Sequence, residues 1–127
     1  MSPKWKKCTS TEEKVRHAVA GWQVCWQSAS FRAGVVVTVI GLSLAAMLGT
    51  SAPMMGVLVL AFAVAWISEM VNTGIELAVD RVGTEWHPLS RDAKDVAACA
   101  ATLAYTIAIA MCSMCILYHG VCRVKRV

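Results

Sequence analysis

The sequence predicts an all-α integral membrane protein with an N-terminal amphipathic surface helix and three transmembrane helices. Of its 127 residues, 57% are hydrophobic and 16% are charged, which is too apolar for an ordinary soluble domain. Residues 34–68 carry no charged side chain over 35 positions, and residues 96–118 carry none over 23. Because a span needs about 20 apolar residues to cross about 30 Å of hydrocarbon, the shorter stretch is one span and the longer stretch is two.

The segment at residues 11–30 is predicted to form the surface helix. Thr11, Glu12 and Glu13 suit a helix start, because a hydroxyl can cap backbone N–H groups and acids favour the positive end of the helix dipole. Apolar residues then recur at three- and four-residue intervals, as in an amphipathic helix lying on a membrane: Val15, Ala18, Val19, Trp22 and Trp26. The polar, basic character of this N-terminal region argues against a cleaved secretory signal.

The three spans are expected at 34–50, 53–79 and 95–119, within a single membrane domain that covers residues 1–127. The turn-forming run from Gly49 to Pro53 separates the first two spans. Residues 53–68 rise only about 24 Å, so the second helix has to continue past the hydrocarbon as a cytoplasmic extension. Alanines along the last span permit close helix approach, which favours an oligomer.

Basic residues predict the orientation in the membrane. Nine of the twelve Lys and Arg residues precede the first span or lie between the second and third spans, and the hairpin between the first two spans has none. By the positive-inside rule, the N-terminus and the second loop are cytoplasmic. Three spans then place the C-terminus outside, although Arg123, Lys125 and Arg126 favour the cytoplasm.

The positions of the six cysteines argue against a disulfide framework, and Cys112 and Cys115 are interpreted as small apolar packing residues rather than as a metal or redox site. Cys99, Cys112 and Cys115 fall within the last span, while Cys8 and Cys25 lie in the basic N-terminal segment. Cys112 and Cys115 form a C-x-x-C pair, but no second pair of ligands accompanies them.

Acidic residues are concentrated at one membrane boundary. Six of the eight acids lie within residues 69–95, where span two ends: Glu69, Glu76, Asp80, Glu85, Asp92 and Asp95. At about 100° per residue, Glu69, Glu76 and Asp80 share one helix face within roughly 40°, with Asn72 about 40° from Glu76. A carboxylate facing lipid is costly, so this face is expected to point into protein or a hydrated cleft and to be functional.

Clustered carboxylates suit Mg²⁺, which takes oxygen ligands and commonly accompanies nucleotide phosphates. Phosphoryl transfer then requires positioning, charge neutralisation and a base for the attacking hydroxyl. Glu69 has the depth to be that base for a lipid hydroxyl, and Lys94, beside Asp95, can neutralise phosphate charge. Neither a P-loop nor a G-x-G-x-x-G motif is present.

Two other hypotheses belong to different classes. A small ion or proton transporter would use Glu69 and Glu76 to bind the cation, but it requires acids on more than one span, and spans one and three have none. A structural membrane protein would use the acids only to pair with basic residues of the loop, namely Arg81, Arg91 and Lys94. Nothing in the sequence indicates nucleic-acid binding.

The run from Glu69 to Asp80, Glu-x-x-Asn-Thr-Gly-Ile-Glu-x-x-x-Asp, resembles the signature of the small prokaryotic diacylglycerol kinase and undecaprenol kinase family. A second matching run follows at the expected spacing and contains Glu85, Trp86, His87, Ser90, Ala93, Lys94 and Asp95. The resemblance implies an ATP- and Mg²⁺-dependent lipid kinase that works as a homotrimer in the cell inner membrane, with its active sites facing the cytoplasm between subunits. Diacylglycerol and undecaprenol are both candidate substrates.

The resemblance also implies roles for individual residues. Glu69 would be the catalytic base, and Glu76 would bind the metal and, through it, the ATP phosphates. The remaining ATP-site residues would line or shape the nucleotide site: Asn72, Asp80, Glu85, Trp86, His87, Lys94 and Asp95. Phe31, Arg32 and Ala98, together with Glu69, would contact the lipid substrate.

The sequence departs from the family pattern at the N-terminal helix. Three residues before the Phe31-Arg32 pair, the family usually has a second metal-binding glutamate, whereas this chain has Ser28. A serine supplies no formal charge, so we expect weaker metal affinity, with the hydroxyl or a water completing the Mg²⁺ shell. Ala33 and Gly34 also leave no acid after Arg32.

Overall fold

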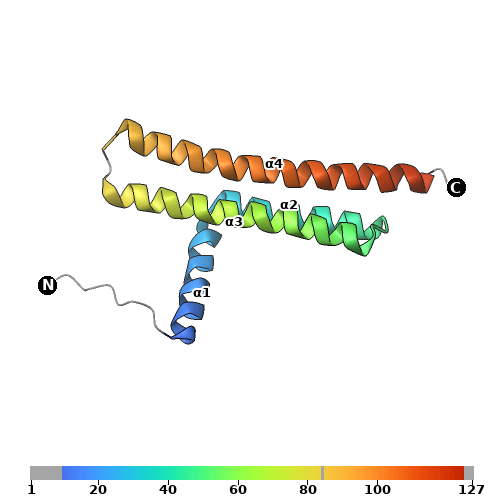
Figure 1. Ribbon diagram of the computed structural model, residues 1–127, viewed down its shortest axis with the longest axis horizontal. Helices are drawn as coiled ribbons and strands as arrows, with labels where there is room; N and C mark the ends of the chain where they lie inside the picture. The colour runs from blue at the N-terminus through green and yellow to red at the C-terminus, as the bar shows by residue number, and fades with distance from the viewer. Residues whose placement is uncertain (1–9, 84, 125–127) are drawn as a thin grey trace.

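The computed structural model describes residues 10–83 and 85–124 and contains four helices in this part of the chain. These are α1 (Thr11–Gln27), α2 (Ala29–Met47), α3 (Ala52–Val82) and α4 (Pro88–Val124). The last three lie side by side along a common axis, and α1 turns away from it (Figure 1). Three of the helices are long and apolar enough to cross a membrane, which confirms the prediction of an all-α protein with three membrane helices.

The helices differ in length, and this difference positions the acidic residues. At 1.5 Å per residue, the 19 residues of α2 span about 28 Å, whereas the 31 residues of α3 and the 37 of α4 span about 46 and 55 Å. The ends of α3 and α4 next to residues 83–87 project beyond the α1–α2 junction (Figure 1). Since α2 alone matches the hydrocarbon thickness, these projecting ends carry polar residues beyond it.

The turn between α2 and α3 occupies residues 48–51, within the region where the sequence predicts a break. Gly49 has a φ of +80°, a conformation that side chains disfavour. The Thr50 hydroxyl donates to the Ala45 carbonyl at 2.7 Å, satisfying one of the free carbonyls at the end of α2. Pro53 then lies in the first turn of α3, where its missing N–H costs no hydrogen bond.

Ser28 forms the elbow between α1 and α2. Its side chain accepts a hydrogen bond from the Phe31 backbone N–H at 3.4 Å and so caps the start of α2. The Arg32 guanidinium donates from Nη1 to the carbonyls of Trp26 and Gln27, at 2.9 and 3.1 Å. A cation on the last carbonyls of α1 complements the negative end of that helix. The elbow is thus held by two side chains: Ser28 caps the start of α2, and Arg32 binds the last carbonyls of α1.

An aromatic cluster fixes α1 against the membrane helices. Phe31 is 0% exposed, and its ring centroid lies 5.1 Å from Trp22, 6.3 Å from Trp26 and 6.2 Å from Trp66. Edge-on and tilted contacts of this kind stabilise aromatic pairs. Trp66 Nε1 also donates to Thr38 Oγ1 at 3.0 Å, which ties α3 to α2 at the same level.

Small residues make up much of the core. Its fully buried members are Ala45, Leu58, Phe62, Ala65, Ala108, Cys112 and Cys115. Alanine and cysteine let α3 and α4 approach closely, as in many membrane helix pairs. The five cysteines among the described residues are free, and Cys112 and Cys115 pack in this core, as small apolar residues would. Cys8 lies outside the described residues.

Several sequence-based expectations stay predictions at this level. Lys4, Lys6 and Lys7, on which much of the orientation argument depends, lie outside the described residues, as do Lys125 and Arg126 of the tail. The apolar side chains of α1 are exposed in the single chain, with Val15 at 58% and Val19 at 55%. An exposed apolar face of this kind is compatible with a helix resting on a membrane surface.

We expect Phe31→Ala to destabilise the protein by about 3 kcal/mol, since it removes a buried ring from the aromatic cluster. The measurement is unfolding in mixed detergent, followed by circular dichroism. Val24→Ala is the matched control, because Val24 lies on α1 and is 40% exposed. Equal stability of the two variants would show that the cluster does not hold the elbow.

Candidate functional site

The polar residues of α3 form one stripe that passes from buried to exposed. Glu69 is 6% exposed and Asn72 7%, Glu76 is partly buried, and Asp80 is exposed. Each step follows the helix toward the loop at residues 83–87, so side-chain hydration increases along the stripe. At 1.5 Å per residue, Glu76 lies about 10 Å and Asp80 about 16 Å further along the axis than Glu69.

Asn72 and Glu76 form a pair at the middle of the stripe. Asn72 Nδ2 donates to Glu76 Oε1 at 3.1 Å, which orients one carboxylate oxygen. Asn72 Oδ1 is buried and has no hydrogen-bond partner within the described part of the chain. An amide oxygen and a carboxylate are both ligands that Mg²⁺ accepts. No group of three His, Cys, Asp or Glu side chains suited to a metal occurs among the described residues.

Glu69 lines a cavity of about 330 Å³ between α2, α3 and α4. Its wall is made by Ser30, Ala33, Gly34, Val37, Glu69, Thr102, Tyr105, Thr106 and Ile109. Glu69 forms no hydrogen bond or ion pair with any residue that the structure describes. A charged side chain within the hydrocarbon is costly, and Glu69 lies at the edge of it, so a carboxylate kept at this depth without a partner among the described residues indicates function.

Tyr105 is the residue of this cavity that the sequence analysis missed. Its hydroxyl oxygen is buried without a hydrogen-bond partner among the described residues, a situation that costs about 1–3 kcal/mol. The ring fits against α2 because position 34 is glycine, where an added Cβ would lie 2.0 Å from Tyr105 Oη. The available signal was a tyrosine inside an otherwise apolar span, but nothing local pairs it with Gly34.

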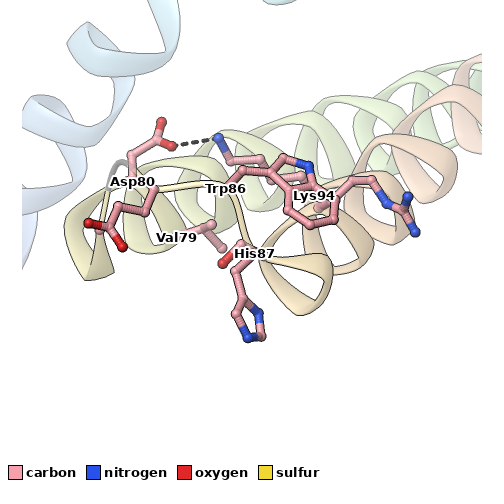
Figure 2. A pocket seen from close by; sticks show the side chains of 9 residues that line it. Val79, Asp80, Trp86, His87 and Lys94 are labelled. Carbon is pink, nitrogen blue, oxygen red and sulfur yellow. Dashed lines mark hydrogen bonds and ion pairs between the residues drawn. The ribbon is translucent and has the colours of Figure 1, made fainter.

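A second cleft, of about 320 Å³, lies at the loop end of α3 and α4 (Figure 2). Asp80 and Lys94 face each other across it, with Lys94 Nζ donating to Asp80 Oδ1 at 2.5 Å. The lining also includes Glu85, Trp86, His87, Ser90 and Arg91. Five predicted ATP-site residues therefore line one cleft: Asp80, Glu85, Trp86, His87 and Lys94.

His87 lines this cleft and also caps the start of α4, which begins at the next residue. Its Nδ1 accepts a hydrogen bond from the Leu89 backbone N–H at 3.2 Å, and its carbonyl accepts from the Arg91 N–H at 3.1 Å. Pro88 follows it at the first helical position, where proline is favoured. These features explain why α4 starts before the span expected at 95–119. The ring points away from the Asp80–Lys94 pair (Figure 2).

Asp95 lies on a different face of α4 from Lys94. Its nearest basic partner is Arg91, with Nε and Oδ2 3.9 Å apart, while Arg91 also donates to Asp92 at 2.7 Å. Consecutive helical residues point about 100° apart. The partner of Lys94 is therefore Asp80 of α3, and Asp95 does not orient that lysine within the described chain.

The residues expected at the lipid substrate are not gathered in one place. Phe31 is fully buried in the aromatic cluster, and Arg32 caps the end of α1. Ala98 is exposed, one turn before Thr102, whose hydroxyl donates to the Ala98 carbonyl at 2.8 Å. Of the four, only Glu69 lines the cavity, while Ala98 lies at its loop end on α4.

Comparison with known proteins places this arrangement in a family. The model of the family described as prokaryotic diacylglycerol kinase matches residues 16–117. A diacylglycerol kinase of Pseudomonas aeruginosa is 34% identical over 92 residues, which cover 72% of this chain and 75% of that protein.

Similar relatives occur in other bacteria. A diacylglycerol kinase of Escherichia coli K12 is 34% identical over 98 residues, covering 76% of this chain and 79% of the relative. One from Helicobacter pylori is 36% identical over 81 residues, covering 63% of each chain. The matched segment contains α2 and α3 with both clefts. The chain is thus a multi-pass membrane protein that belongs to the prokaryotic diacylglycerol kinase family, a family of lipid kinases.

Proposed function

We propose that the protein transfers the γ-phosphoryl group of ATP, with Mg²⁺, to the hydroxyl of a membrane lipid alcohol. The substrates would be diacylglycerol, giving phosphatidic acid, or undecaprenol, giving undecaprenyl phosphate. The observation that carries this proposal is that Glu69, a carboxylate with no ion-pair partner among the described residues, lines a cavity at membrane level. Asp80, which pairs with Lys94 in the second cleft, lies on the same helix as Glu69. Family membership and the names of the relatives support the same activity.

Glu69 would act as the general base. A base must come within hydrogen-bond reach of the proton it takes, and Glu69 lines the cavity with no hydrogen bond or ion pair to a described residue that would occupy its oxygens. A lipid hydroxyl held at the interface would enter the cavity from the hydrocarbon side. Removal of its proton makes the oxygen a better nucleophile for the terminal phosphorus.

The residues at the middle of the stripe fit a magnesium ion. Glu76 offers a carboxylate whose orientation Asn72 fixes, and Asn72 Oδ1 is an oxygen without a partner among the described residues. Mg²⁺ usually takes one or two carboxylates and completes its shell with phosphates and waters. When bound, the ion would neutralise phosphate charge. The chain's own contribution is to hold these oxygens between Glu69 and the Asp80–Lys94 cleft.

The Asp80–Lys94 cleft would hold the nucleotide. Lys94 supplies a positive charge that can shift from Asp80 to phosphate oxygens, and Asp80 keeps the flexible lysine in the cleft until then. The Trp86 side chain is exposed, so its ring can stack on the adenine. Glu85 and His87 complete the lining. Asp95, which pairs with Arg91, would act by shaping this helix end.

The assembly would be a homotrimer in the cell inner membrane with its sites facing the cytoplasm. The residues that line both clefts leave one side of each open in a single chain, and the small side chains of α4 allow another subunit to approach. α1 would lie on the cytoplasmic surface with Val15 and Val19 in the lipid head-group region. Phe31, Arg32 and Ala98 would then define the edge of the substrate entrance.

Glu69→Gln is expected to lower kinase activity at least a hundredfold, the usual range for loss of a general base. The measurement is transfer of labelled γ-phosphate from Mg²⁺-ATP to diacylglycerol and to undecaprenol in detergent micelles. Glu12→Gln, at the exposed start of α1, is the control and should keep full activity. A wild-type protein that phosphorylates neither lipid would refute the kinase proposal, and an active Glu69→Gln variant would refute the role of the base.

Lys94→Met should raise the KM for Mg²⁺-ATP about tenfold, because a charged contact to phosphate is lost. The KM for the lipid should not change, since Lys94 does not line the Glu69 cavity. Arg91→Met is the matched control in the same cleft, where the guanidinium is already held by Asp92. Equal effects of the two substitutions on KM would argue against a specific phosphate contact by Lys94.

Ser28→Glu is expected to raise the apparent affinity for Mg²⁺ about tenfold, because it restores the metal-binding glutamate that the family usually has at this position. The Mg²⁺ dependence of activity at saturating ATP measures it. Ser28→Gln has nearly the same size and no charge, so it reports the cost of losing the α2 cap alone. If both variants require the same Mg²⁺ concentration as wild type, Ser28 lies away from the metal.

A further inference from the structure

The Glu69 cavity changes character along its length. Glu69, Ser30 and Thr102 line one end, and Val37 and Ile109 line the other. Val37 and Ile109 also line a neighbouring cleft of about 210 Å³, which continues between α2 and α4 as far as Ile116. Since each helical turn rises 5.4 Å, the two clefts together lead from Glu69 toward the middle of the bilayer. Their shape and polarity suit a molecule with one polar end and an apolar tail.

Gly34 of α2 and Tyr105 of α4 contact each other in the wall of the Glu69 cavity. Gly34 is buried on α2, and an added Cβ there would lie 2.0 Å from Tyr105 Oη and 2.4 Å from Cζ. No real side chain tolerates contacts this short, and the ring is held on α4 within the bundle. The phenol of Tyr105 therefore occupies its place only because residue 34 lacks a side chain.

The Tyr105 hydroxyl has unused hydrogen-bonding capacity. A phenol carries one donor and can also accept, yet Tyr105 Oη has no partner in the described chain and is covered by neighbouring atoms. Its ring already lines the cavity that holds Glu69. To reach the head group of an occupant, the side chain would have to turn from Gly34 toward the cavity, and there the hydroxyl could form the hydrogen bond that it lacks.

We propose that Tyr105 is a specificity-determining residue whose hydroxyl donates a hydrogen bond to an ester carbonyl of the lipid beside its reacting hydroxyl. This inference rests on the proposed lipid kinase function and adds a choice among substrates. In a diacylglycerol, one ester is attached to the carbon next to the one that bears the hydroxyl. A prenol has no polar group besides its hydroxyl, so it leaves Tyr105 Oη unpaired, and the site discriminates against it.

Unpaired polar groups are effective at rejecting the wrong substrate. A site built to hydrogen-bond a substrate group loses that bond and keeps the desolvated partner when the group is missing. Glu69 alone cannot make this distinction, because both lipids present the same primary hydroxyl to it. Gly34 takes part by accommodating the phenol, which an added side chain at that position would displace.

The test compares wild type with Tyr105→Phe on three lipids in the same micelles: a diacylglycerol, the dialkylglycerol diether with matching chains, and a long-chain prenol. The diether keeps the shape and the hydroxyl but has no carbonyl. We expect Tyr105→Phe to lower kcat/KM about tenfold for the diester, the equivalent of one hydrogen bond. Turnover of the diether and the prenol should not change. Tyr118→Phe is the control, since Tyr118 is exposed near the other end of α4.

Gly34→Ala provides a second, independent variant. It displaces the phenol, so it should also reduce the ratio of diester to diether turnover, whatever its effect on total activity. An equal loss on all three lipids in Tyr105→Phe would reduce Tyr105 to a packing role, and no loss on the diester would show that its hydroxyl is unused. Either result overturns the proposal while leaving the kinase function intact. A wild-type protein inactive on every lipid would instead refute the proposed function.

Discussion

An unbroken helix, α3, carries the carboxylates of the proposed reaction across the edge of the hydrocarbon. Its 31 residues exceed what the membrane needs, so Glu69 lies buried at membrane depth while Asp80 is exposed beyond it. Because the helix is continuous, the axial separations among Glu69, Glu76 and Asp80 are fixed by the 1.5 Å rise per residue. A break in α3 would let the distance between the Glu69 cavity and the Asp80–Lys94 cleft vary. Residues carried on a loop would not be held at this spacing as rigidly as residues on one helix.

The other two membrane helices, α2 and α4, pack against α3 and complete the clefts. α4 runs alongside α3 and supplies Lys94 to Asp80 at one end and Tyr105 to the Glu69 cavity further along. α2 closes the cavity, and the elbow at Ser28 holds α1 near the level of Trp66 through the ring of Phe31. Within the single chain, Phe31 and Arg32 make structural contacts at this elbow, and the substrate role expected for them stays a prediction.

In the proposed reaction, the two clefts would separate the reactants by polarity. The Glu69 cavity and its continuation toward Ile116 become apolar with depth, as a lipid tail requires. The Asp80–Lys94 cleft lies at the loop end and is lined by charged and aromatic side chains, as a nucleotide requires. Phosphoryl transfer needs little covalent chemistry from the protein, so bringing a lipid hydroxyl and a metal-bound triphosphate together from these two phases is most of the task.

Hydropathy and helical period are local properties, so the amino-acid sequence was enough to predict the membrane class, the three long apolar helices and the polar stripe of α3. The family motif also predicted five residues that line the loop-end cleft, because its members lie close together in the chain, from the end of α3 through the loop to the first turns of α4. The tertiary structure alone decided that Lys94 pairs with Asp80 rather than Asp95, that Phe31 is buried, and that Tyr105 lies against Gly34. These are contacts between different helices, and their formation depends on how the helices rotate and pack, which no local pattern encodes.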